Sequence, residues 1–468
     1  MSKHFILNDK YALRSFSDKK NVLLIKGQVV YRPLFGDEYA IAKLCDGIYS
    51  FSEEEINSKP FQLLLSNELI RPAKPQEQLT EWQKYKECNN HHWPIIDLRL
   101  TERCNYNCPH CFNAADINTN TDEWSYEEFL KLLDEAEACG VVGFSFTGGE
   151  PMVHPYFLDF VKEVYKRGMF LRRLMTNARF ITQDLLDEFK TIGCNPMFQI
   201  SFDGVGTHDI MRGCKGAEKV TLDAIKLCVD NGFHILINTQ VNRLTKDTLL
   251  KTVEVLEDIG VSSVRLIRTN ETPRWAKLQK NATLSTKEYY DFCFEFLSEF
   301  GKKEHKIEVS FWKLGKFNFE NKRYMFDACT MKSKKYSAFD PLCSTCSQEI
   351  CIAANGNIYP CHQASGLADS QGVFYGNVKK QGLQNAINGE LYMTEALMTA
   401  GQMFKNSKEC SACNHFRQCM GGCRIFSKYI LGGLYKPSPF SCQLYNDNFE
   451  EKVATVLPDW ENLVPVEK

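Results

Sequence analysis

The chain has 468 residues, of which 44% are hydrophobic and 12% aromatic, so it is long enough to form several domains with cores of their own. A formal charge of -2 gives it no general attraction to nucleic acid or to a membrane surface. Its first residues lack the apolar run of a secretory signal, and no stretch has the length of a membrane span. We therefore expect a cytoplasmic protein.

Residues 1–75 are predicted to form a small α+β domain. Short apolar runs predict strands over 11–16, 21–26 and 28–34. Helices are predicted over 37–45, 52–57 and 60–65, with Ser52 and Glu55 as a capping box. The polar stretch 76–93 is predicted to be a linker.

Between residues 94 and 310 the order helix, glycine, strand repeats. Five glycines are expected to end helices in a left-handed turn: Gly140, Gly168, Gly193, Gly232 and Gly260. Six strands are predicted, over 95–100, 142–146, 170–175, 197–202, 234–240 and 263–268. Six such βα units with right-handed crossovers predict a partial (β/α)6 barrel, with chemistry at the carboxyl ends of its strands.

A cysteine triplet, Cys104, Cys108 and Cys111, follows the first of these strands. Three thiolates can hold three irons of a [4Fe–4S] cluster and leave the fourth iron open for chemistry, whereas an electron-transfer cluster normally has four cysteines. Zinc is the alternative, because His110 is adjacent and zinc takes four nitrogen or sulfur ligands in closed sites.

Other polar groups follow the next strands. Gly148 and Gly149 allow close approach to the backbone, and Glu150 can accept hydrogen bonds from a ligand ammonium. Arg212 can meet a carboxylate with two hydrogen bonds, or it can form an ordinary surface ion pair. Because these groups follow separate strands, we expect them to share one site with the triplet.

A cysteine-rich region is predicted over 341–445, after a bridging region at 311–340 and before a short helix and tail at 446–468. Its cysteines fall in two groups: Cys343, Cys346, Cys351 and Cys361, then Cys410, Cys413, Cys419, Cys423 and Cys442. Eight of these sulfurs can complete two four-cysteine iron–sulfur clusters, or two zinc ribbons. Eight further cysteines are scattered singly, and we expect most of them to be buried.

Together these motifs resemble the radical S-adenosylmethionine (SAM) enzymes with a SPASM domain. The triplet matches the cluster motif of that family, and Gly148, Gly149 and Glu150 match the motif that binds the methionine amino group. By the same resemblance, the SAM site includes Asn177, Ser201 at a ribose-contacting position, and Arg212 as a carboxylate-binding arginine. His110 departs from the aromatic residue usual before the third cysteine.

The resemblance also implies two auxiliary [4Fe–4S] clusters, three in all. Carried over by spacing, the ligands of the first auxiliary cluster are Cys343, Cys346, Cys361 and Cys423, with Cys351 as the alternative to Cys343. The second auxiliary cluster takes Cys410, Cys413, Cys419 and Cys442.

Residues 1–75 resemble the RiPP recognition element, a winged-helix-like domain that holds the leaders of ribosomally made precursor peptides. A leader would add as an extra strand to an exposed sheet edge. The expected docking residues are Gln28, Val29, Val30, Tyr31 and Arg32. A degenerate domain that only packs on the barrel is the alternative.

The resemblance implies that a reduced cluster splits SAM into methionine and a 5′-deoxyadenosyl radical, which takes a hydrogen atom from the substrate. Flavodoxin or ferredoxin is the expected electron donor, and monomer is the default state. The favoured function is cross-linking of a precursor peptide, with a Cys thioether ahead of a carbon–carbon or ether link.

Two other functions stay open. An anaerobic sulfatase-maturing enzyme, which oxidises Cys or Ser to formylglycine, shares both auxiliary clusters. In that family an Asp base follows the cysteine aligned with Cys361, whereas here the residue is His362, a candidate acid/base or a hydrogen-bond donor to the cluster. A catalytically silent iron–sulfur scaffold is disfavoured by the intact triplet, Glu150 and Arg212.

Overall fold

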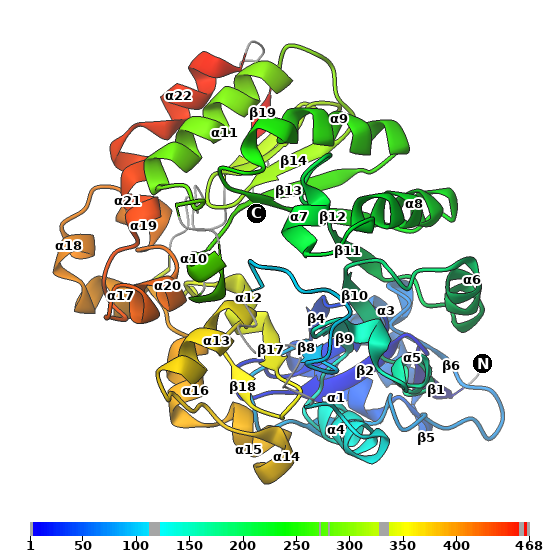
Figure 1. Cartoon of the computed structure of the whole chain (residues 1–468). Helices are drawn as coiled ribbons and strands as arrows, with labels where there is room; N and C mark the ends of the chain where they lie inside the picture. The colour runs from blue at the N-terminus through cyan, green and yellow to red at the C-terminus, as the bar shows by residue number, and fades with distance from the viewer. Residues whose placement is uncertain are drawn as a thin grey trace.

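The computed structural model describes residues 3–111, 122–270, 273–278, 281–326, 337–457 and 463–465. A small N-terminal α+β region, a central strand-and-helix region and a helical C-terminal region follow one another along the chain (Figure 1). The predicted fold class is confirmed: a central parallel sheet of barrel type lies between an α+β domain and a cysteine-rich domain.

The central sheet contains every strand that the repeat predicted, joined in sequence order. These six strands are β8 (Ile95–Arg99), β9 (Gly143–Thr147), β10 (Phe170–Thr176), β11 (Met197–Ser201), β12 (Ile235–Val241) and β13 (Ser263–Arg268). All pair in parallel, so their carboxyl ends meet at one rim.

Two further parallel strands extend this sheet, β14 (Glu308–Phe311) beside β13 and β17 (Glu349–Ile352) beside β8. β17 belongs to the cysteine-rich region, so the sheet itself joins that region to the barrel. The outer strands are β15 (Gly315–Asn318), β16 (Arg323–Phe326), β18 (Ile358–Tyr359) and β19 (Val464–Pro465).

Helices cover the outer face of the sheet (Figure 1). They are α4 (Tyr126–Ala138), α5 (Phe157–Lys166), α6 (Gln183–Ile192), α8 (Ala217–Asp230), α9 (Leu249–Ile259) and α11 (Thr286–Phe300). Ser125 and Glu128 form the capping box of α4, and its Phe129 ring stacks on Phe160 of α5 at 4.0 Å. All five predicted helix-ending glycines have positive φ, which explains the regular alternation of helix and strand.

The inner face of the sheet is polar. Along β11, Phe198 and Ile200 are buried on the helix side, where Phe198 meets Phe189 of α6. The alternate residues Gln199 and Ser201 therefore face inward and are half-buried. A polar inner wall differs from the apolar interior of a packed barrel and suits a bound polar ligand.

The N-terminal domain has two sheets. One has the order β5-β1-β6, and the other β4-β3-β2-β7. Their strands are β1 (His4–Leu7), β2 (Tyr11–Ser15), β3 (Val22–Ile25), β4 (Tyr31–Pro33), β5 (Asp46–Ser50), β6 (Ile70–Pro72) and β7 (Lys86–Glu87). The helices are α1 (Gly36–Leu44), α2 (Glu53–Asn57) and α3 (Lys59–Ser66). The strand predicted over 28–34 is confined to β4, because Gly27 starts a turn at positive φ.

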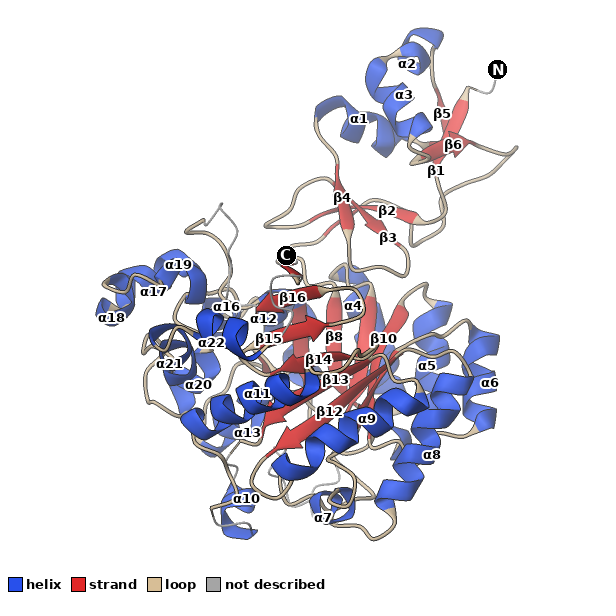
Figure 2. Cartoon of the chain, turned by 90° about the horizontal axis from the view of Figure 1, so that it is seen from above, coloured by secondary structure: helices blue, strands red, loops and turns tan. Residues whose placement is uncertain are grey.

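The four-stranded sheet lies between the rest of this domain and the barrel (Figure 2). Phe16, Val22 and Leu24 form an apolar cluster with Cys88 and with Val142 beside β9. The stretch predicted as a linker is also held in place. For example, Arg14 donates hydrogen bonds to the carbonyls of Trp82 and Lys84, both at 2.7 Å.

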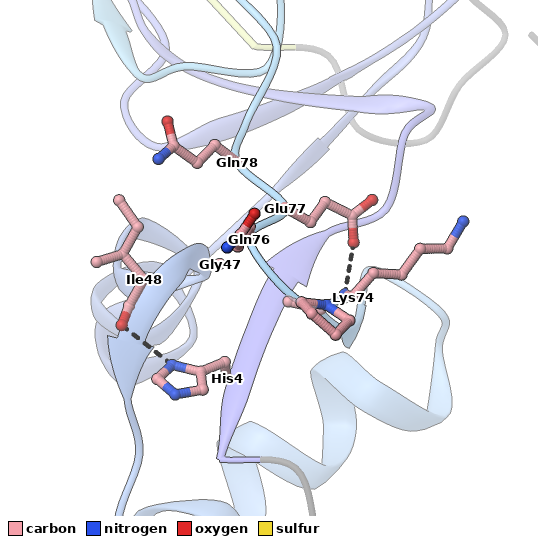
Figure 3. A pocket seen from close by; sticks show the side chains of 9 residues that line it. His4, Gly47, Ile48, Lys74, Gln76, Glu77 and Gln78 are labelled. Atoms are coloured by element: carbon pink, nitrogen blue, oxygen red, sulfur yellow. Dashed lines mark hydrogen bonds between the residues drawn. The ribbon is translucent and has the colours of Figure 1, made fainter.

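A surface pocket of about 430 Å³ lies on the far side of this domain, between β5 and residues 73–78 (Figure 3). On one wall His4 Nδ1 donates a hydrogen bond to the Ile48 carbonyl oxygen, and on the other Glu77 accepts one from the Lys74 backbone. Its walls carry no cysteine, so the iron–sulfur chemistry belongs elsewhere.

The C-terminal region is built from short helices. They are α12 (Ser344–Gln348), α13 (His362–Ser370), α14 (Val378–Gln381), α15 (Leu383–Ile387), α16 (Glu390–Ala396), α17 (Ala400–Asn406), α18 (Lys408–Ser411), α19 (Phe416–Cys419), α20 (Arg424–Tyr429), α21 (Pro439–Asn446) and α22 (Phe449–Val456). Within the described ranges, none of the helices has the length and apolarity needed to cross a membrane. Of the scattered cysteines, Cys214 is half-buried, Cys329 lies outside the described residues, and the rest are buried.

Candidate active site

The cysteine triplet lies in the loop that leaves β8 at the carboxyl rim. The backbone of Tyr106 donates to Cys104 Sγ at 3.4 Å, and Cys111 N donates to the Cys108 carbonyl at 3.2 Å. Burial raises the pKa of Cys104 to about 12, and the nearby Glu150, Cys108 and Cys111 side chains add to the rise. Such thiols ionise when a metal ion binds them, so the loop suits a metal cluster better than a free reactive thiolate.

The glycines after β9 are required by this loop. A Cβ on Gly148 would lie 2.4 Å from the Thr101 carbonyl oxygen, and one on Gly149 would lie 2.2 Å from that of Arg103. Gly149 N also donates to the Thr101 carbonyl at 2.8 Å. The two glycines therefore let the β9 exit support the start of the cysteine loop, a role that the sequence did not reveal.

Glu150 is fully buried beside them. Its carboxylate accepts hydrogen bonds from Thr176 Oγ1 at 2.9 and 3.0 Å, from Asn177 N at 2.8 Å and from Met152 N at 3.3 Å. Burial outweighs these bonds and raises the pKa of Glu150 to about 7. A positively charged ligand would restore the carboxylate to its ionised form, so the site fits the ammonium of SAM.

Asn177 and Ser201 occupy the ends of β10 and β11. The Asn177 amide donates to Asn105 Oδ1 at 2.8 Å, which ties β10 to the cysteine loop. Ser201 is paired with Asn238 of β12. The buried oxygens Gln199 Oε1 and Asn238 Oδ1 meet no hydrogen-bond donor among the described residues. These inward-facing acceptors fit a ligand with hydroxyl or amino donors, as SAM has.

Arg212, on α7 (His208–Arg212), is buried rather than on the surface. Its Nη2 lies 2.6 Å from Asp203 Oδ2, and its Nη1 lies 3.8 Å from Cys108 Sγ. Burial alone would raise the pKa of Asp203, but Arg212 and His110 outweigh it and hold this pKa below its ordinary value. The guanidinium is thus fixed beside the triplet, where it can face a ligand carboxylate.

The first group of C-terminal cysteines divides in two. Cys343, Cys346 and Cys361 interact, because a hydrogen bond with Cys346 lowers the pKa of Cys343, and Cys343 and Cys361 raise that of Cys346. Cys351 on β17 instead lies with Asp97 and His362, their ligand atoms within 4.8 Å of one another. Cys361 is also close enough to Cys351 to raise its pKa, but the hydrogen bond between Cys343 and Cys346 favours Cys343 over Cys351 as a cluster ligand. Cys423 is the N-cap residue of α20, and its carbonyl oxygen accepts a hydrogen bond from Ser427 N.

The second group gathers around α18 and α21. Burial raises the pKa of Cys442, and the nearby Cys410 and Cys413 thiols raise it further. Cys419 Sγ accepts a hydrogen bond from Gly421 N at 3.3 Å. Gly421 and Gly422 have φ of 82° and 78°, which turns the chain between Cys419 and Cys423.

His362 lies at the start of α13 beside the inner face of the sheet. Its Nε2 lies 2.9 Å from Asp97 Oδ2, and Arg173 Nη2 lies 3.9 Å from the same oxygen. Asp97 is fully buried, and its pKa lies below the ordinary value because His362 and Arg173 outweigh burial. Sequence patterns missed Asp97 and Asn105. Thr176 and Asp203 stand at or just after the ends of predicted strands, where polar groups were expected to share the site.

Comparisons with known proteins agree with this geometry. The model of the radical SAM superfamily matches residues 98–256, and the model of the SPASM iron–sulfur cluster-binding domain matches residues 343–414. The chain therefore carries a radical SAM domain followed by a SPASM domain, as its motifs predicted, and it is a radical SAM enzyme.

Two relatives of the chain are named for particular activities. The PqqA peptide cyclase of Granulibacter bethesdensis is 22% identical over 372 residues, which is 77% of this chain and 91% of the relative. The AdoMet-dependent heme synthase of Methanosarcina barkeri is 22% identical over 355 residues, which is 74% of this chain and 95% of the relative.

Two solved structures share the fold. Streptococcus suis SuiB bound to its precursor peptide SuiA has a TM-score of 0.67 at 13% identity, over 93% of this chain and 99% of SuiB. The enzyme anSMEcpe with bound AdoMet and Cp18Cys peptide has a TM-score of 0.59 at 19% identity, over 79% of this chain and 100% of anSMEcpe. The wider match means that the likeness to SuiB extends into the N-terminal domain.

Proposed function

We propose that this protein modifies a ribosomally made precursor peptide and installs a cross-link in it. A thioether from a Cys thiol is the leading product, and a carbon–carbon or ether link is the alternative. The PqqA peptide cyclase and the peptide-bound SuiB structure support a peptide substrate. The observation that carries the proposal is the N-terminal domain, because the structural likeness to SuiB extends into it and β4 is the edge strand of its four-stranded sheet.

The β4 edge is suited to hold a leader peptide. Leu34 N donates to the Asn21 carbonyl at 2.8 Å, and Arg32 is paired with Leu23, so these residues bond inward to β3. In an antiparallel ladder the alternate residues Tyr31 and Pro33 then direct their backbone groups outward. A leader would pair there as an added strand, with Gln28, Val29 and Val30 in the turn before it.

The cofactors of the proposed reaction are SAM and three [4Fe–4S] clusters. When bound, SAM and the cluster at Cys104, Cys108 and Cys111 supply a 5′-deoxyadenosyl radical that removes a hydrogen atom from the peptide. Glu150 holds the ammonium of SAM and Arg212 its carboxylate. Asn177 fixes the loop, and Ser201 contacts the ribose. The auxiliary ligand sets are Cys343, Cys346, Cys361 and Cys423, then Cys410, Cys413, Cys419 and Cys442.

His362 is proposed to accept a proton from the peptide, and the auxiliary clusters would accept the electron that remains when the cross-link forms. Asp97 Oδ2 lies 2.9 Å from the Nε2 of His362, so this carboxylate would stabilise the imidazole ring once it has taken up the proton. We further propose that flavodoxin or ferredoxin supplies the electron and that the protein works as a cytoplasmic monomer.

The test is co-expression of the enzyme with a leader-bearing, cysteine-containing peptide under anaerobic conditions. Mass spectrometry should show the loss of a pair of hydrogen atoms for each cross-link, together with a thiol that no longer reacts with an alkylating agent. The variant Cys104→Ala should leave the peptide unmodified. If the enzyme cleaves SAM but leaves the peptide unmodified, the proposal is wrong.

Sulfatase maturation is the second candidate, supported by the shared fold of anSMEcpe. That likeness covers 79% of the chain, whereas the likeness to SuiB covers 93%. A sulfatase-derived peptide offered without a leader decides between the two. Conversion of its Cys or Ser to formylglycine would support maturation, and no conversion would support the leader-dependent function.

A further inference from the structure

Tyr392, on α16, has a buried hydroxyl group that the protein leaves without a hydrogen bond. The side chain is 0% exposed, and its OH meets no partner among the described residues. A buried hydroxyl in this state is destabilising, because it has lost its hydrogen bonds to water and gained none in return. Buried polar groups are nearly always satisfied in folded proteins, so this one points to a partner that the polypeptide does not supply.

The surroundings of Tyr392 identify that partner. The Tyr392 ring lies 5.6 Å from the ring of Trp93, whose Nε1 donates to the Cys346 carbonyl at 3.1 Å. Negative charge on Cys351, Cys346 or Cys361 would act directly on the Tyr392 hydroxyl. Two of these three cysteines belong to the proposed first auxiliary cluster.

The chemistry of the group matches an anionic sulfur acceptor. A tyrosine hydroxyl is a donor as well as an acceptor, and cysteine thiolates and cluster sulfides accept hydrogen bonds. The ordinary pKa of a tyrosine hydroxyl is about 10, so the group keeps its proton at neutral pH. It is therefore a permanent donor beside a site of negative charge.

We propose that the Tyr392 hydroxyl donates a hydrogen bond to a sulfur of the first auxiliary cluster and thereby raises its reduction potential. The added electron makes the reduced cluster more negative, so a donor stabilises the reduced form more than the oxidised form. Tyr392 is a positioning residue, since it acts on the cluster and touches no substrate. The inference rests on the proposed ligand set and is independent of the peptide substrate.

The test measures the potential of the auxiliary clusters alone. A variant that lacks Cys104, Cys108 and Cys111 cannot hold the SAM-binding cluster, and iron analysis then verifies that both auxiliary clusters are loaded. In this background, Tyr392→Phe keeps the ring and removes only the hydroxyl. Redox titration followed by electron paramagnetic resonance should show a lower potential for one auxiliary cluster and an unchanged potential for the other.

Tyr359→Phe is the matched control. Tyr359 is also a buried tyrosine of the same region, but its hydroxyl already donates to Asp369 Oδ1 at 2.7 Å. This variant should leave both potentials unchanged. Equal potentials in Tyr392→Phe and the parent protein would overturn the proposal, as would an equal shift of both clusters.

A second measurement does not depend on how well the variant folds. In the reduced parent protein, electron–nuclear double resonance should detect one strongly coupled proton at the first auxiliary cluster that exchanges in deuterated water. Its absence would mean that the hydroxyl bonds the Cys351 thiol or a trapped water molecule instead, and the proposal would fail. Missing iron at the site would refute the ligand set, a result distinct from a missing proton.

Discussion

Glu150 shows how one buried residue sets the conditions for cofactor binding. The protein surrounds its carboxylate with neutral donors, from Thr176, Asn177 and Met152, and with no cation among the described contacts. Burial therefore decides its charge, and its pKa rises from 4.5 to about 7. In the proposed SAM site, the ammonium of the ligand would supply the missing positive charge.

A stability measurement tests this residue directly. Because the folded pKa is higher than the unfolded one, the SAM-free protein binds more protons than its unfolded chain between the two values. Its stability should therefore fall as pH rises from about 4.5 to about 7, by roughly 3 kcal/mol from this group. The Glu150→Gln variant should not show this fall of stability with rising pH. Urea unfolding at a series of pH values measures it, and equal slopes in both proteins would contradict the argument.

Binding should show the opposite trend. In the proposed role of Glu150, SAM binds the ionised carboxylate, so its affinity for the wild-type enzyme should fall by up to about tenfold per pH unit below the pKa of Glu150. Anaerobic calorimetry with reconstituted enzyme measures this dependence. Glu150→Gln should bind SAM weakly at every pH, and a steep dependence in that variant would assign the titration to another group.

The residues that sequence could predict are those in local motifs. Cys104, Cys108 and Cys111, or Gly148 to Glu150, stand out because their spacing is unusual within a few positions. Asp97 and Tyr392 have no such spacing. Asp97 stands inside an apolar strand, and its partner His362 comes from the far end of the chain. Their importance arises from contacts across the fold, which no pattern along the chain encodes.

At the scale of elements, the exit of β9 and the cysteine loop act as one unit. Gly149→Ala should place a Cβ against the Arg103 carbonyl oxygen, at 2.2 Å in the present geometry. Because the atoms that this Cβ would meet belong to the backbone, the loop must move. We expect the free energy of unfolding to fall by about 2 kcal/mol or more, and the cluster at Cys104, Cys108 and Cys111 to load poorly. Urea unfolding measures the stability, and iron analysis measures the cluster loading.

Gly433→Ala is the control for this substitution, because an added Cβ there meets only the flexible Lys436 side chain. It should change stability and iron content little. Full iron loading in Gly149→Ala would show that the loop tolerates displacement.

The β4 edge carries a second prediction. Tyr31→Pro removes a backbone N–H that points outward, so the domain should fold while leader binding weakens by about tenfold. Tyr31→Ala keeps the N–H and serves as the control for the lost ring. Fluorescence anisotropy with a labelled leader peptide measures the affinities. Equal binding by Tyr31→Pro and Tyr31→Ala would exclude pairing at this edge.

As with the residues, the elements that the sequence could predict are those whose signals are local along the chain. All six repeat strands and the glycines that end their helices were predictable, because each signal lies within one βα unit. β14 and β17 were not, since each has four residues and takes its place from a partner strand. β1, β5 and β6 are short strands that form one sheet only after the chain has folded back.

At the scale of the whole molecule, His91 bridges the N-terminal domain and the SPASM region. His91 Nδ1 lies 2.9 Å from Asp18 of the N-terminal domain, and its Nε2 lies 3.0 Å from the carbonyl oxygen of Ser347 on α12. Burial alone would raise the pKa of Asp18, but His91 and Lys19 outweigh it and hold this pKa well below its ordinary value. Asp18 is therefore charged at neutral pH and holds the histidine in place.

We expect the His91 contact to affect the modification of peptides that are held by their leader and no other activity of the enzyme. Fixing the domain sets the distance between a docked leader and the SAM site, so a looser domain lowers the effective concentration of the core peptide. His91→Ala loses two hydrogen bonds, one of them to a carboxylate, worth about 1.5–3 kcal/mol. We expect modification of the leader-bearing peptide to slow several-fold, with leader affinity and peptide-free SAM cleavage unchanged. His4→Ala, at an exposed histidine of the same domain, should change none of the three. A His91→Ala enzyme that modified the peptide at the full rate would show that the leader positions its substrate without a fixed domain.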